Sequence, residues 1–411
     1  MTTHTLTCTL LLLAACLPEK GDDVSCGEGT HLEGSTCVGD APSDDSGEPT
    51  AEGGGSEGGG EDGGGEGGGD SYTVCASGGA PYTDIQDAVD DASDGDTITV
   101  CAGTYGPVDL SRRDLTLQGV DGSEVTTIDG GSQTPITIVD TPTGVSVSGF
   151  TLTASPITDG DLCGIEGTYA IAALSDLRLT GCNTTGSRYA FGIYLVGSDV
   201  TITGLIVEDN VLQGGLLNAT TGGSLVLRHS IFRNNTASGG GIPVTLVDVG
   251  GTELEMSNNL IYNNDTYQQP VNLNVVGAAQ WVYNNVIYNN TATFSEGQYG
   301  TIRVDGAVEV YNNIIANNTS GIAGTGGNFS YNDIWGNALY DIPNSDRYGW
   351  TFDTLEANIS SDPKFTDPDA GDFTLTSFSP CLDAGNPISG YDDVDGSTND
   401  IGAYGGPFGS W

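Results

Sequence analysis

Short runs of alternating apolar and polar residues recur along the chain from about residue 114 to residue 337. The runs are three to six residues long and rich in β-branched side chains. Such alternation is typical of β-strands that bury one face. The pattern therefore predicts many short strands and little helix. Representative runs are residues 193–196, 200–203, 225–227, 271–276, 302–304 and 308–311.

One octapeptide, SNNLIYNN from Ser257, sets the spacing of these runs. It returns as RHSIFRNN from Arg228, YNNVIYNN from Tyr283 and YNNIIANN from Tyr311, with a degraded copy, YNDIWGN, from Tyr331. Superposition places one residue of each copy in a column, at spacings of 29, 26, 28 and 20 residues, and glycines extend the column upstream. Its members are Gly119, Gly149, Gly181, Gly204, Ser230, Asn259, Asn285, Asn313 and Asp333.

This column predicts a turn with positive φ once per repeat, because glycine and asparagine enter the left-handed region most readily. The repeat length is too short for an ordinary strand–helix–strand crossover. Three strands and three turns per repeat give a parallel β-solenoid of about nine coils. His229 aligns with Asn258, Asn284 and Asn312, so we expect a structural role for it in a polar ladder at this turn.

A short helix is expected before the repeats. Ile85, Ala88, Val89 and Ala92 have helical spacing, and Gly95 ends the pattern before an apolar strand at residues 97–101. This stretch resembles the N-terminal cap of pectate-lyase-like right-handed β-helix proteins. The elements DPKF, GDFTL, SPCLDAG and DIGAY near the other end resemble the C-terminal segment of secreted bacterial proteins of that fold.

The resemblance runs from about residue 71 to the end of the chain. It implies an all-β, right-handed parallel β-helix with a short capping helix, and it is specific for fold rather than for activity. Cys75 and Cys101 flank the expected helix, so we expect a disulfide between them. We divide this body into a cap with the first coil (71–113), the β-helix (114–339) and a C-terminal segment (340–411).

The first 70 residues predict an anchor and a tether. Residues 6–15 are apolar but too short to cross a bilayer, and LAAC at 13–16 resembles a lipoprotein lipobox. We expect a signal peptide at 1–15, lipidation of Cys16, a loop at 16–38 closed by a Cys26–Cys37 disulfide, and a disordered Gly/Glu-rich tether at 39–70. The segment MTTHT lacks Lys and Arg, which leaves a misplaced start codon or ordinary secretion open.

Charge and cysteines restrict the partners and the compartment. The net charge of -45 comes from 55 acidic residues against 10 Lys and Arg, which argues against nucleic acid or anionic lipid as a partner. We expect a monomer that meets the membrane only through its lipid anchor. Nine cysteines indicate an oxidising, extracytoplasmic location: a bacterial outer-membrane lipoprotein or a secreted protein. Cys163 and Cys182 are a further candidate disulfide, with a core thiol at Cys182 as the alternative.

Strand alternation places Asn272 and Asn274 outside one coil and Arg303 and Asp305 outside the next, near Tyr194. Pectate lyases use carboxylates for calcium and an Arg or Lys as base, so the resemblance makes Arg303 and Asp305 candidate catalytic residues. A surface ion pair is the alternative, because arginine is normally protonated. The NTD, DD, GHG and RIK signatures of the glycosidases on this fold do not occur in the coils.

A second set of candidates precedes the asparagine column. Glu255 and Glu309 lie two coils apart, about 9–10 Å, at the upper edge of the range for inverting glycosidases. Exposed aromatic rings there suit stacking on sugars, with cross-strand stacking as the structural alternative. One outward position comprises Glu255, Trp281, Glu309 and Phe329, and a second comprises Ser257, Tyr283, Tyr311 and Tyr331.

Calcium is the one cofactor for which the sequence offers candidate ligands. Asp393, Asp395 and Asp400 in DVDGSTND offer oxygens around a glycine turn, but the twelve-residue loop pattern and its final Glu are missing. A network of Asx turns is the alternative, so we otherwise expect no cofactor.

Three functions remain open. The first is a surface-anchored, non-catalytic β-helix that binds a polysaccharide or another cell-surface component through Trp281, Tyr283, Tyr311, Asn272, Asn274 and Tyr194. The second is a polysaccharide lyase or glycoside hydrolase that uses Arg303 with Asp305 or Glu255 with Glu309. The third is a structural adhesin or spacer. The scarcity of basic residues favours binding, because a lyase must neutralise the carboxylate of an anionic uronate.

Overall fold

The computed structural model of the chain describes residues 30–33, 36–39, 71–155, 162–183, 190–237, 245–274, 277–294, 300–343 and 351–410. The chain forms two compact units, residues 1–64 and 65–411. The described part of the first is an antiparallel hairpin of β1 (Thr30–Glu33) and β2 (Thr36–Gly39). The expected lipidation site Cys16 and the cysteine Cys26 lie outside the described residues. Within the described part, no helix is long and apolar enough to cross a membrane.

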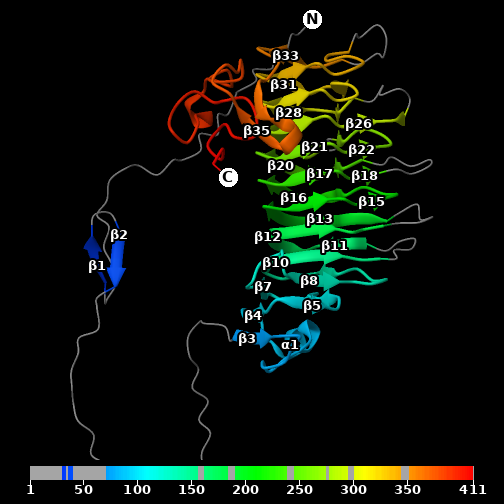
Figure 1. Ribbon diagram of the computed structural model, residues 1–411, viewed down its shortest axis with the longest axis vertical. Helices are drawn as coiled ribbons and strands as arrows, with labels where there is room; N and C mark the ends of the chain where they lie inside the picture. The colour runs from blue at the N-terminus through cyan, green and yellow to red at the C-terminus, as the bar shows by residue number, and fades with distance from the viewer. Residues whose placement is uncertain are drawn as a thin grey trace, which may run out of the picture. The chain divides into compact units, whose positions relative to one another are not determined.

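The second unit is a right-handed parallel β-helix of about ten turns, close to the nine predicted (Figure 1). Its strands stack in three parallel ladders, which we name A, B and C. Ladder A contains β6 (Val108–Asp109), β9 (Ile136–Val139), β11 (Leu162–Thr168), the first parts of β13 (Phe191–Thr203) and β16 (Leu217–Arg228), β19 (Val247–Gly250), β23 (Val271–Asn274), β27 (Ile302–Asp305) and β30 (Ile322–Thr325).

Ladder B follows ladder A in each turn. It contains β3 (Ser71–Val74), β4 (Thr97–Val100), β7 (Thr116–Gly119), the first parts of β10 (Val145–Thr153) and β12 (Ile171–Thr180), the second parts of β13 and β16, β20 (Glu253–Ser257), β24 (Gln280–Tyr283), β28 (Val308–Tyr311), β31 (Asn328–Ser330) and β33 (Thr354–Glu356).

Ladder C closes each turn. It contains β5 (Gly103–Tyr105), β8 (Thr126–Asp129), the second parts of β10 and β12, β14 (Ile206–Glu208), β17 (Ile231–Arg233), β21 (Leu260–Tyr262), β25 (Val286–Tyr288), β29 (Ile314–Ala316) and β32 (Asp333–Trp335). A small ladder beside it contains β15 (Val211–Leu212), β18 (Thr236–Ala237), β22 (Asp265–Thr266) and β26 (Thr291–Ala292).

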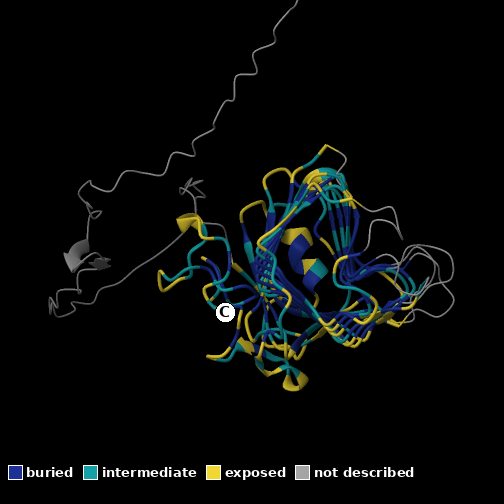
Figure 2. Ribbon diagram, turned by 90° about the horizontal axis from the view of Figure 1, so that it is seen from above, coloured by how far each residue is buried: buried dark blue, intermediate teal, exposed yellow. Residues whose placement is uncertain are grey.

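The core lies inside the coils. Strand residues alternate between buried and accessible positions, as in β23, where Val271 and Leu273 are buried and Asn272 and Asn274 are not. Figure 2, seen along the stack, shows the buried residues lining the inner side of the superposed coils. Each coil therefore buries its apolar side chains against the coils above and below, as a solenoid requires.

The cap forms as predicted. Helix α1 (Ile85–Asp91) begins at Asp84, whose carboxylate accepts the Gln86 N–H at 2.8 Å, and the helix packs against β3, β4 and β6. Ile85, Ala88 and Val89 are its buried residues. The predicted Cys75–Cys101 disulfide is present and joins the two sides of this cap.

Positive φ angles recur at the bend between ladders B and C, but in the repeats that begin at Arg228, Ser257, Tyr283 and Tyr311 they lie one residue earlier than predicted. The left-handed residues between ladders B and C are Gly149, Asp176, Gly204, His229, Asn258, Asn284, Asn312 and Tyr331. Gly181 belongs to the following turn, and Gly119 has no positive φ. The prediction of a positive φ at this bend was therefore right at Gly149 and Gly204 and wrong at Gly119 and Gly181, and Ser230, Asn259, Asn285 and Asn313 do not have positive φ themselves.

The next residue of each repeat forms a buried ladder of asparagines. Asn259, Asn285 and Asn313 each receive side-chain hydrogen bonds from the preceding coil and donate to the following one at 2.9–3.0 Å. Asn313 donates to Asn332, not to Asp333, which pairs with Ile314 instead. The alignment of the column was thus right for its central members, although their φ is not positive, and wrong by one residue for Asp333.

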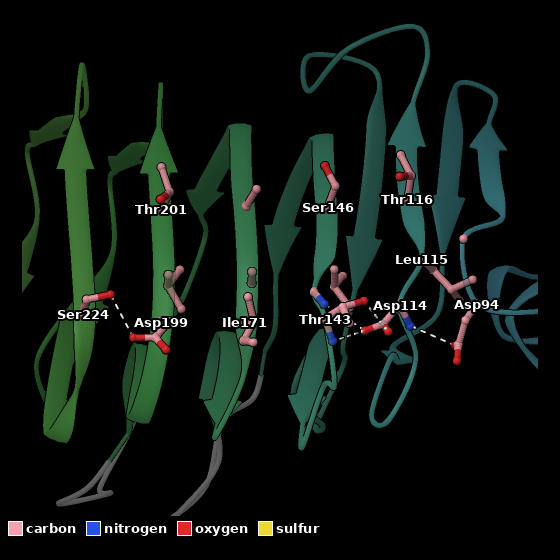
Figure 3. Close-up of a pocket in the computed structure, with 16 residues that line it drawn as sticks. Asp94, Asp114, Leu115, Thr116, Thr143, Ser146, Ile171, Asp199, Thr201 and Ser224 are labelled. Atoms are coloured by element: carbon pink, nitrogen blue, oxygen red, sulfur yellow. Dashed lines mark hydrogen bonds between the residues drawn. The ribbon is translucent and has the colours of Figure 1, made fainter. Parts of the chain in front are cut away.

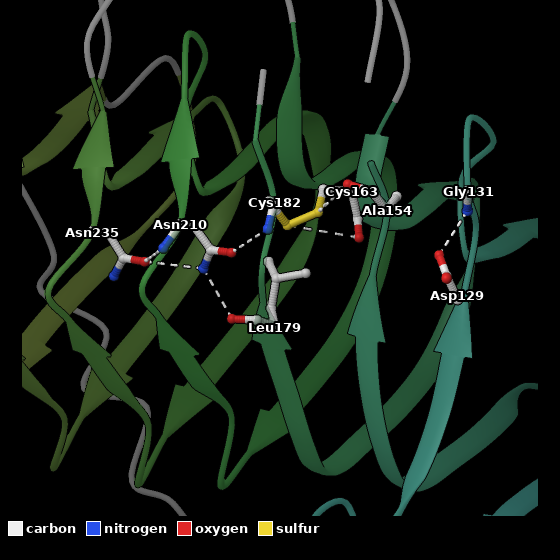
Figure 4. Close-up of a disulfide and its surroundings, with 8 residues drawn as sticks. All are labelled: Asp129, Gly131, Ala154, Cys163, Leu179, Cys182, Asn210 and Asn235. Carbon is white, nitrogen blue, oxygen red and sulfur yellow. Dashed lines mark hydrogen bonds between the residues drawn. A yellow bond between two sulfur atoms is a disulfide. The ribbon is translucent and has the colours of Figure 1, made fainter. Parts of the chain in front are cut away.

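A second buried asparagine ladder follows ladder C. It runs through Asn210, Asn235, Asn264, Asn290, Asn318 and Asn337. Cys182 stands at its start, since the Cys182 N–H donates to the Asn210 side chain at 3.0 Å, and it forms the expected disulfide with Cys163 (Figure 4). The disulfide excludes the alternative of a core thiol at Cys182.

The C-terminal segment, orange to red in Figure 1, lies along the later turns. It contains η2 (Pro368–Ala370), the hairpin β34 (Phe365–Asp367) and β35 (Asp372–Leu375), and η3 (Ser389–Tyr391). Residues 386–408, which we name the C-terminal strap, bind the left-handed column. Their backbone carbonyls accept hydrogen bonds from Asn258 and Asn284, and Asn312 accepts the Asn386 N–H. His229 Nε2 lies 2.7 Å from the Phe408 carbonyl oxygen, so this histidine has a structural contact, as expected.

Candidate functional site

A row of polar and aromatic side chains follows the outer face of ladder A. Strand register aligns one outward residue on each of β11, β13, β16, β19, β23 and β27. The strand spacing of about 4.8 Å makes this row about 24 Å long. We name it row A. Its members are Glu166, Tyr194, Asn218, Asp248, Asn272 and Arg303.

Row A brings together three residues that the sequence singled out, Tyr194, Asn272 and Arg303. The Tyr194 ring stacks on Phe191 of the same strand, with centroids 5.2 Å apart and planes 28° apart. Asn272 Nδ2 donates to Asp248 Oδ1 at 2.9 Å. The row therefore offers one supported aromatic face next to amide and carboxyl groups.

Asp248 is the residue of row A that the sequence analysis missed. It lies between Asn218 and Asn272 in the register. Burial raises the pKa of its carboxyl, and the hydrogen bond from Asn272 opposes that rise only in part. The alternation in residues 247–250 was a signal that could have found it, because Val247 and Val249 are the buried positions.

Arg303 and Asp305 form an ion pair. Arg303 Nη2 lies 2.8 Å from Asp305 Oδ2, and its Nε donates to the same oxygen at 3.0 Å. Asp305 also accepts the Thr325 hydroxyl at 3.2 Å, and it aligns with Asn274 of the preceding coil. A guanidinium has donors and no acceptor, which does not suit it to act as a base. The surface ion pair, the alternative weighed for these residues, is what the structure contains.

The second candidate set lies on ladder B, and its predicted register needs two corrections. Glu255, Trp281 and Glu309 share one outward position, as expected. The next member is Asn328, because Phe329 aligns with the inward Val310 and is fully buried. In the neighbouring column, Ser330 takes the place predicted for Tyr331.

Tyr283 and Tyr311 are not the exposed rings that the sequence predicted. Each is only 8 % exposed, and their rings stack at 5.1 Å with planes 1° apart. Tyr391 of the C-terminal strap covers Tyr311 at a centroid distance of 5.1 Å. The cross-strand stack, the structural alternative, therefore describes this pair. Trp281 is the half-buried aromatic residue of the set.

Both glutamates of this set already have partners. Glu255 forms an ion pair with Arg228 and accepts the hydroxyl of Tyr283, whose pKa burial and this contact raise to about 12. Glu309 accepts Asn328 Nδ2 at 2.5 Å. These bonds hold each carboxylate against the sheet.

The calcium candidates hold backbone turns. Asp393 accepts the N–H groups of Asp400 and Gly406, Asp395 accepts the Ser397 N–H at 2.9 Å, and Asp400 accepts the Asp383 N–H at 2.7 Å. Across the described ranges, no group of three or more His, Cys, Asp or Glu side chains could hold a metal ion. This arrangement matches the Asx-turn network that was the alternative to a calcium loop.

Comparison with known proteins shows similarity of fold alone. No protein-family model and no curated protein matches the chain. A pectate lyase structure is 13 % identical with a TM-score of 0.47, and the match covers 82 % of this chain and 96 % of that one. The carrot pectin methylesterase is 12 % identical with a TM-score of 0.40, covering 74 % and 91 %. The catalytic unit of an α-1,3-glucanase from Streptomyces thermodiastaticus is 15 % identical with a TM-score of 0.36, covering 71 % and 69 %. Values this low carry no argument about function.

Proposed function

We propose that the β-helix binds a polysaccharide along row A and does not cleave it. The observation that carries this proposal is the alignment of Tyr194, Asn218, Asp248 and Asn272 on four successive coils. A sugar ring offers one apolar face and a rim of hydroxyls, so it is matched by an aromatic ring followed by amide and carboxyl groups. Regular strand spacing repeats these groups along an extended chain.

The charge along row A favours a neutral polysaccharide. Arg303 is the one basic member, and Asp305 neutralises it. Glu166 and Asp248 add acidic groups, in a chain whose net charge is -45. An anionic uronate chain would meet repulsion here, whereas neutral hydroxyls can donate to the carboxyl and amide oxygens.

The cellular setting is part of the proposal. The two disulfides of the β-helix, Cys75–Cys101 and Cys163–Cys182, fit an extracytoplasmic protein. The lipobox-like LAAC ending at Cys16 supports a lipid anchor, and the Gly/Glu-rich residues 39–70 would then hold the β-helix away from the membrane.

One observation favours an enzyme as the alternative. Burial raises the pKa of Asp248, and a carboxyl with a raised pKa is better suited to act as a general acid. Asp248 lies within the same row as the proposed binding residues, so a bound glycan would contact it. A hydrolase or lyase centred on Asp248 is therefore the second candidate.

The first test measures binding by the full chain on an array of neutral and uronate polysaccharides. We expect Tyr194→Ala to weaken binding of the neutral glycan about tenfold, because it removes the stacking face. Gln118→Ala on the exposed face of ladder B should leave binding unchanged. An unaltered affinity for the neutral glycan in Tyr194→Ala would show that row A is not the binding site.

A product assay on the bound glycan, with and without calcium, separates binding from catalysis. Asp248→Asn keeps the size of the side chain and a hydrogen-bonding oxygen but cannot act as an acid. We expect no new reducing ends or unsaturated sugars from either protein. Products from the native chain that disappear in Asp248→Asn, with binding retained, would establish the enzyme instead.

A further inference from the structure

An elongated cavity lies on a different face from row A, over the early turns of ladder B. It has a volume of about 790 Å³ and extends from the turn before β4 to β16 (Figure 3). Six adjacent strands make its length about 24 Å. It is lined by Asp94, Gly95, Asp114, Leu115, Thr116, Thr143, Gly144, Val145, Ser146, Ile171, Ala172, Ala173, Asp199, Val200, Thr201 and Ser224.

Small side chains form the floor of this groove. Thr116, Ser146, Ala173 and Thr201 share one outward position on successive strands. The same position further along ladder B carries Glu255, Trp281 and Glu309, which are larger. The floor is therefore low over the early turns and rises over the later ones. Figure 3 shows Thr116 and Ser146 on neighbouring strands and Thr201 on the second strand beyond Ser146, all facing the cavity.

The neighbouring row supplies an apolar patch in the middle of the groove. Ile171 is 39 % exposed. Gly144 occupies the same row on the preceding coil. A Cβ at Gly144 would lie 3.2 Å from Ile171 Cγ2, so a larger residue there would crowd the Ile171 side chain. Tyr169, two residues before Ile171 and just outside the residues that line the groove, is 61 % exposed, and its ring lies against Gly197 of the next coil. An exposed ring supported from behind suits stacking on a sugar.

The polar groups of the groove are acceptors and hydroxyls. Asp114 accepts the Thr143 and Gly144 N–H groups at 2.9 and 2.8 Å, which fixes the turn at the edge of the groove. Asp199 accepts the Ser224 hydroxyl at 2.8 Å through one oxygen and is exposed to solvent. None of the described residues that line the groove is basic. An anionic ligand is therefore disfavoured, whereas a chain of neutral hydroxyls finds carboxylate acceptors along one edge and hydroxyls on the floor.

We propose that this groove is a second glycan site, which takes an extended neutral oligosaccharide across the coils from β4 to β16. The sugar rings pack on Ile171, Ala173 and the Tyr169 ring, and their hydroxyls bond to Asp199 and the floor hydroxyls. The groove belongs to ladder B and row A to ladder A, so the two sites use different faces of the same coils. The proposal stands on its own cavity and holds whether or not row A binds.

The test is titration calorimetry of the full chain with neutral hexasaccharides of glucose, mannose and xylose, and with a galacturonate hexamer as the anionic probe. We expect a neutral hexasaccharide to bind and the galacturonate not to bind. Ala173→Trp fills the floor and should weaken binding at least about tenfold. Ser175→Trp, on the same strand but outside the lining, should stay within about twofold of the native affinity.

Tyr169→Ala provides a second variant that does not fill the groove, and it should weaken neutral hexasaccharide binding about tenfold. Tyr194→Ala distinguishes the two sites, since it removes a row A residue and leaves the groove intact. The proposal for the groove would be overturned if Ala173→Trp and Tyr169→Ala leave the affinity for the neutral hexasaccharide unchanged. A preference for galacturonate would overturn it as well. Loss in Tyr194→Ala alone would assign the binding to row A.

Discussion

Replacing Asn285 by alanine should lower the free energy of unfolding by about 4 kcal/mol. Asn285 is fully buried in the middle of the first asparagine ladder. Its Nδ2 donates to the carbonyls of Met256 and Tyr283 and to Asn313 Oδ1, at 2.9–3.0 Å. Its Oδ1 accepts from the backbone and side-chain nitrogens of Asn259. Alanine removes these five hydrogen bonds in a place where water cannot replace the lost amide.

The midpoint of urea unfolding, followed by circular dichroism, measures this effect. Asn274→Ala is the matched control, because Asn274 lies on β23 of the same turn, is exposed, and makes no side-chain hydrogen bond within the described residues. We expect its midpoint to match that of the native chain. Equal midpoints for Asn285→Ala and Asn274→Ala would show that the buried ladder does not stabilise the fold.

The same ladder explains why the repeat alignment predicted the fold yet failed at its last member, Asp333. A ladder member must donate and accept together, which an amide does and an ionised carboxylate cannot. Asn332 donates to the Val310 carbonyl at 2.9 Å and accepts from Asn313, whereas Asp333 faces elsewhere. The requirement that a ladder member both donate and accept would have placed Asn332 of the motif YNDIWGN in the column instead of Asp333.

The burial of the candidate aromatic residues could not be predicted from local alternation. Register correctly placed Tyr283 and Tyr311 next to each other. Their covering residue, Tyr391, comes from the C-terminal strap, far away in the sequence. The repeat pattern does not predict this contact. The strap is bound through Asn258, Asn284 and Asn312, and from the sequence these asparagines were expected only to form a polar ladder at their own turn.

The groove on ladder B could not be predicted from the sequence for a different reason. Thr116, Ser146, Ala173 and Thr201 are ordinary residues within their own strands. Their small size matters only when the coils are stacked in register, and the early repeats lack the SNNLIYNN motif that fixed the register later in the chain. Row A was found in part, because Asn272 and Arg303 lie in the coils where that motif gives the register.

Replacing Asp333 by asparagine should stabilise the protein at neutral pH and not at pH 4. Asp333 is fully buried, accepts the Ser361 N–H at 3.1 Å, and faces the thiol of the free cysteine Cys381 at 3.2 Å. Burial, more than any other cause, raises its pKa to about 6, and the charges of Asp341 and Asp362 act in the same direction. The contact joins ladder C to the C-terminal segment.

The sign of the effect follows from proton binding. Between its unfolded pKa of about 3.9 and its folded pKa, Asp333 holds its proton more tightly in the folded protein. Stability from this residue is therefore fully present below pH 4, falls as the pH rises to about 6, and is then constant. The loss amounts to about 3 kcal/mol at pH 7. Asp400, whose pKa burial also raises to about 6, adds to the fall in both proteins.

Unfolding in urea at several pH values between 4 and 7 tests this prediction through the difference between Asp333→Asn and the native chain. Asparagine keeps an oxygen for the Ser361 N–H and carries no charge, so the difference should grow from near zero at pH 4 to about 3 kcal/mol at pH 7. Asp209→Asn, at an exposed carboxylate on a left-handed turn that asparagine also favours, should show no such growth. A difference that is independent of pH would mean that Asp333 does not titrate in this interval, and that the contact between Asp333 and Cys381 holds the C-terminal segment equally well at every pH.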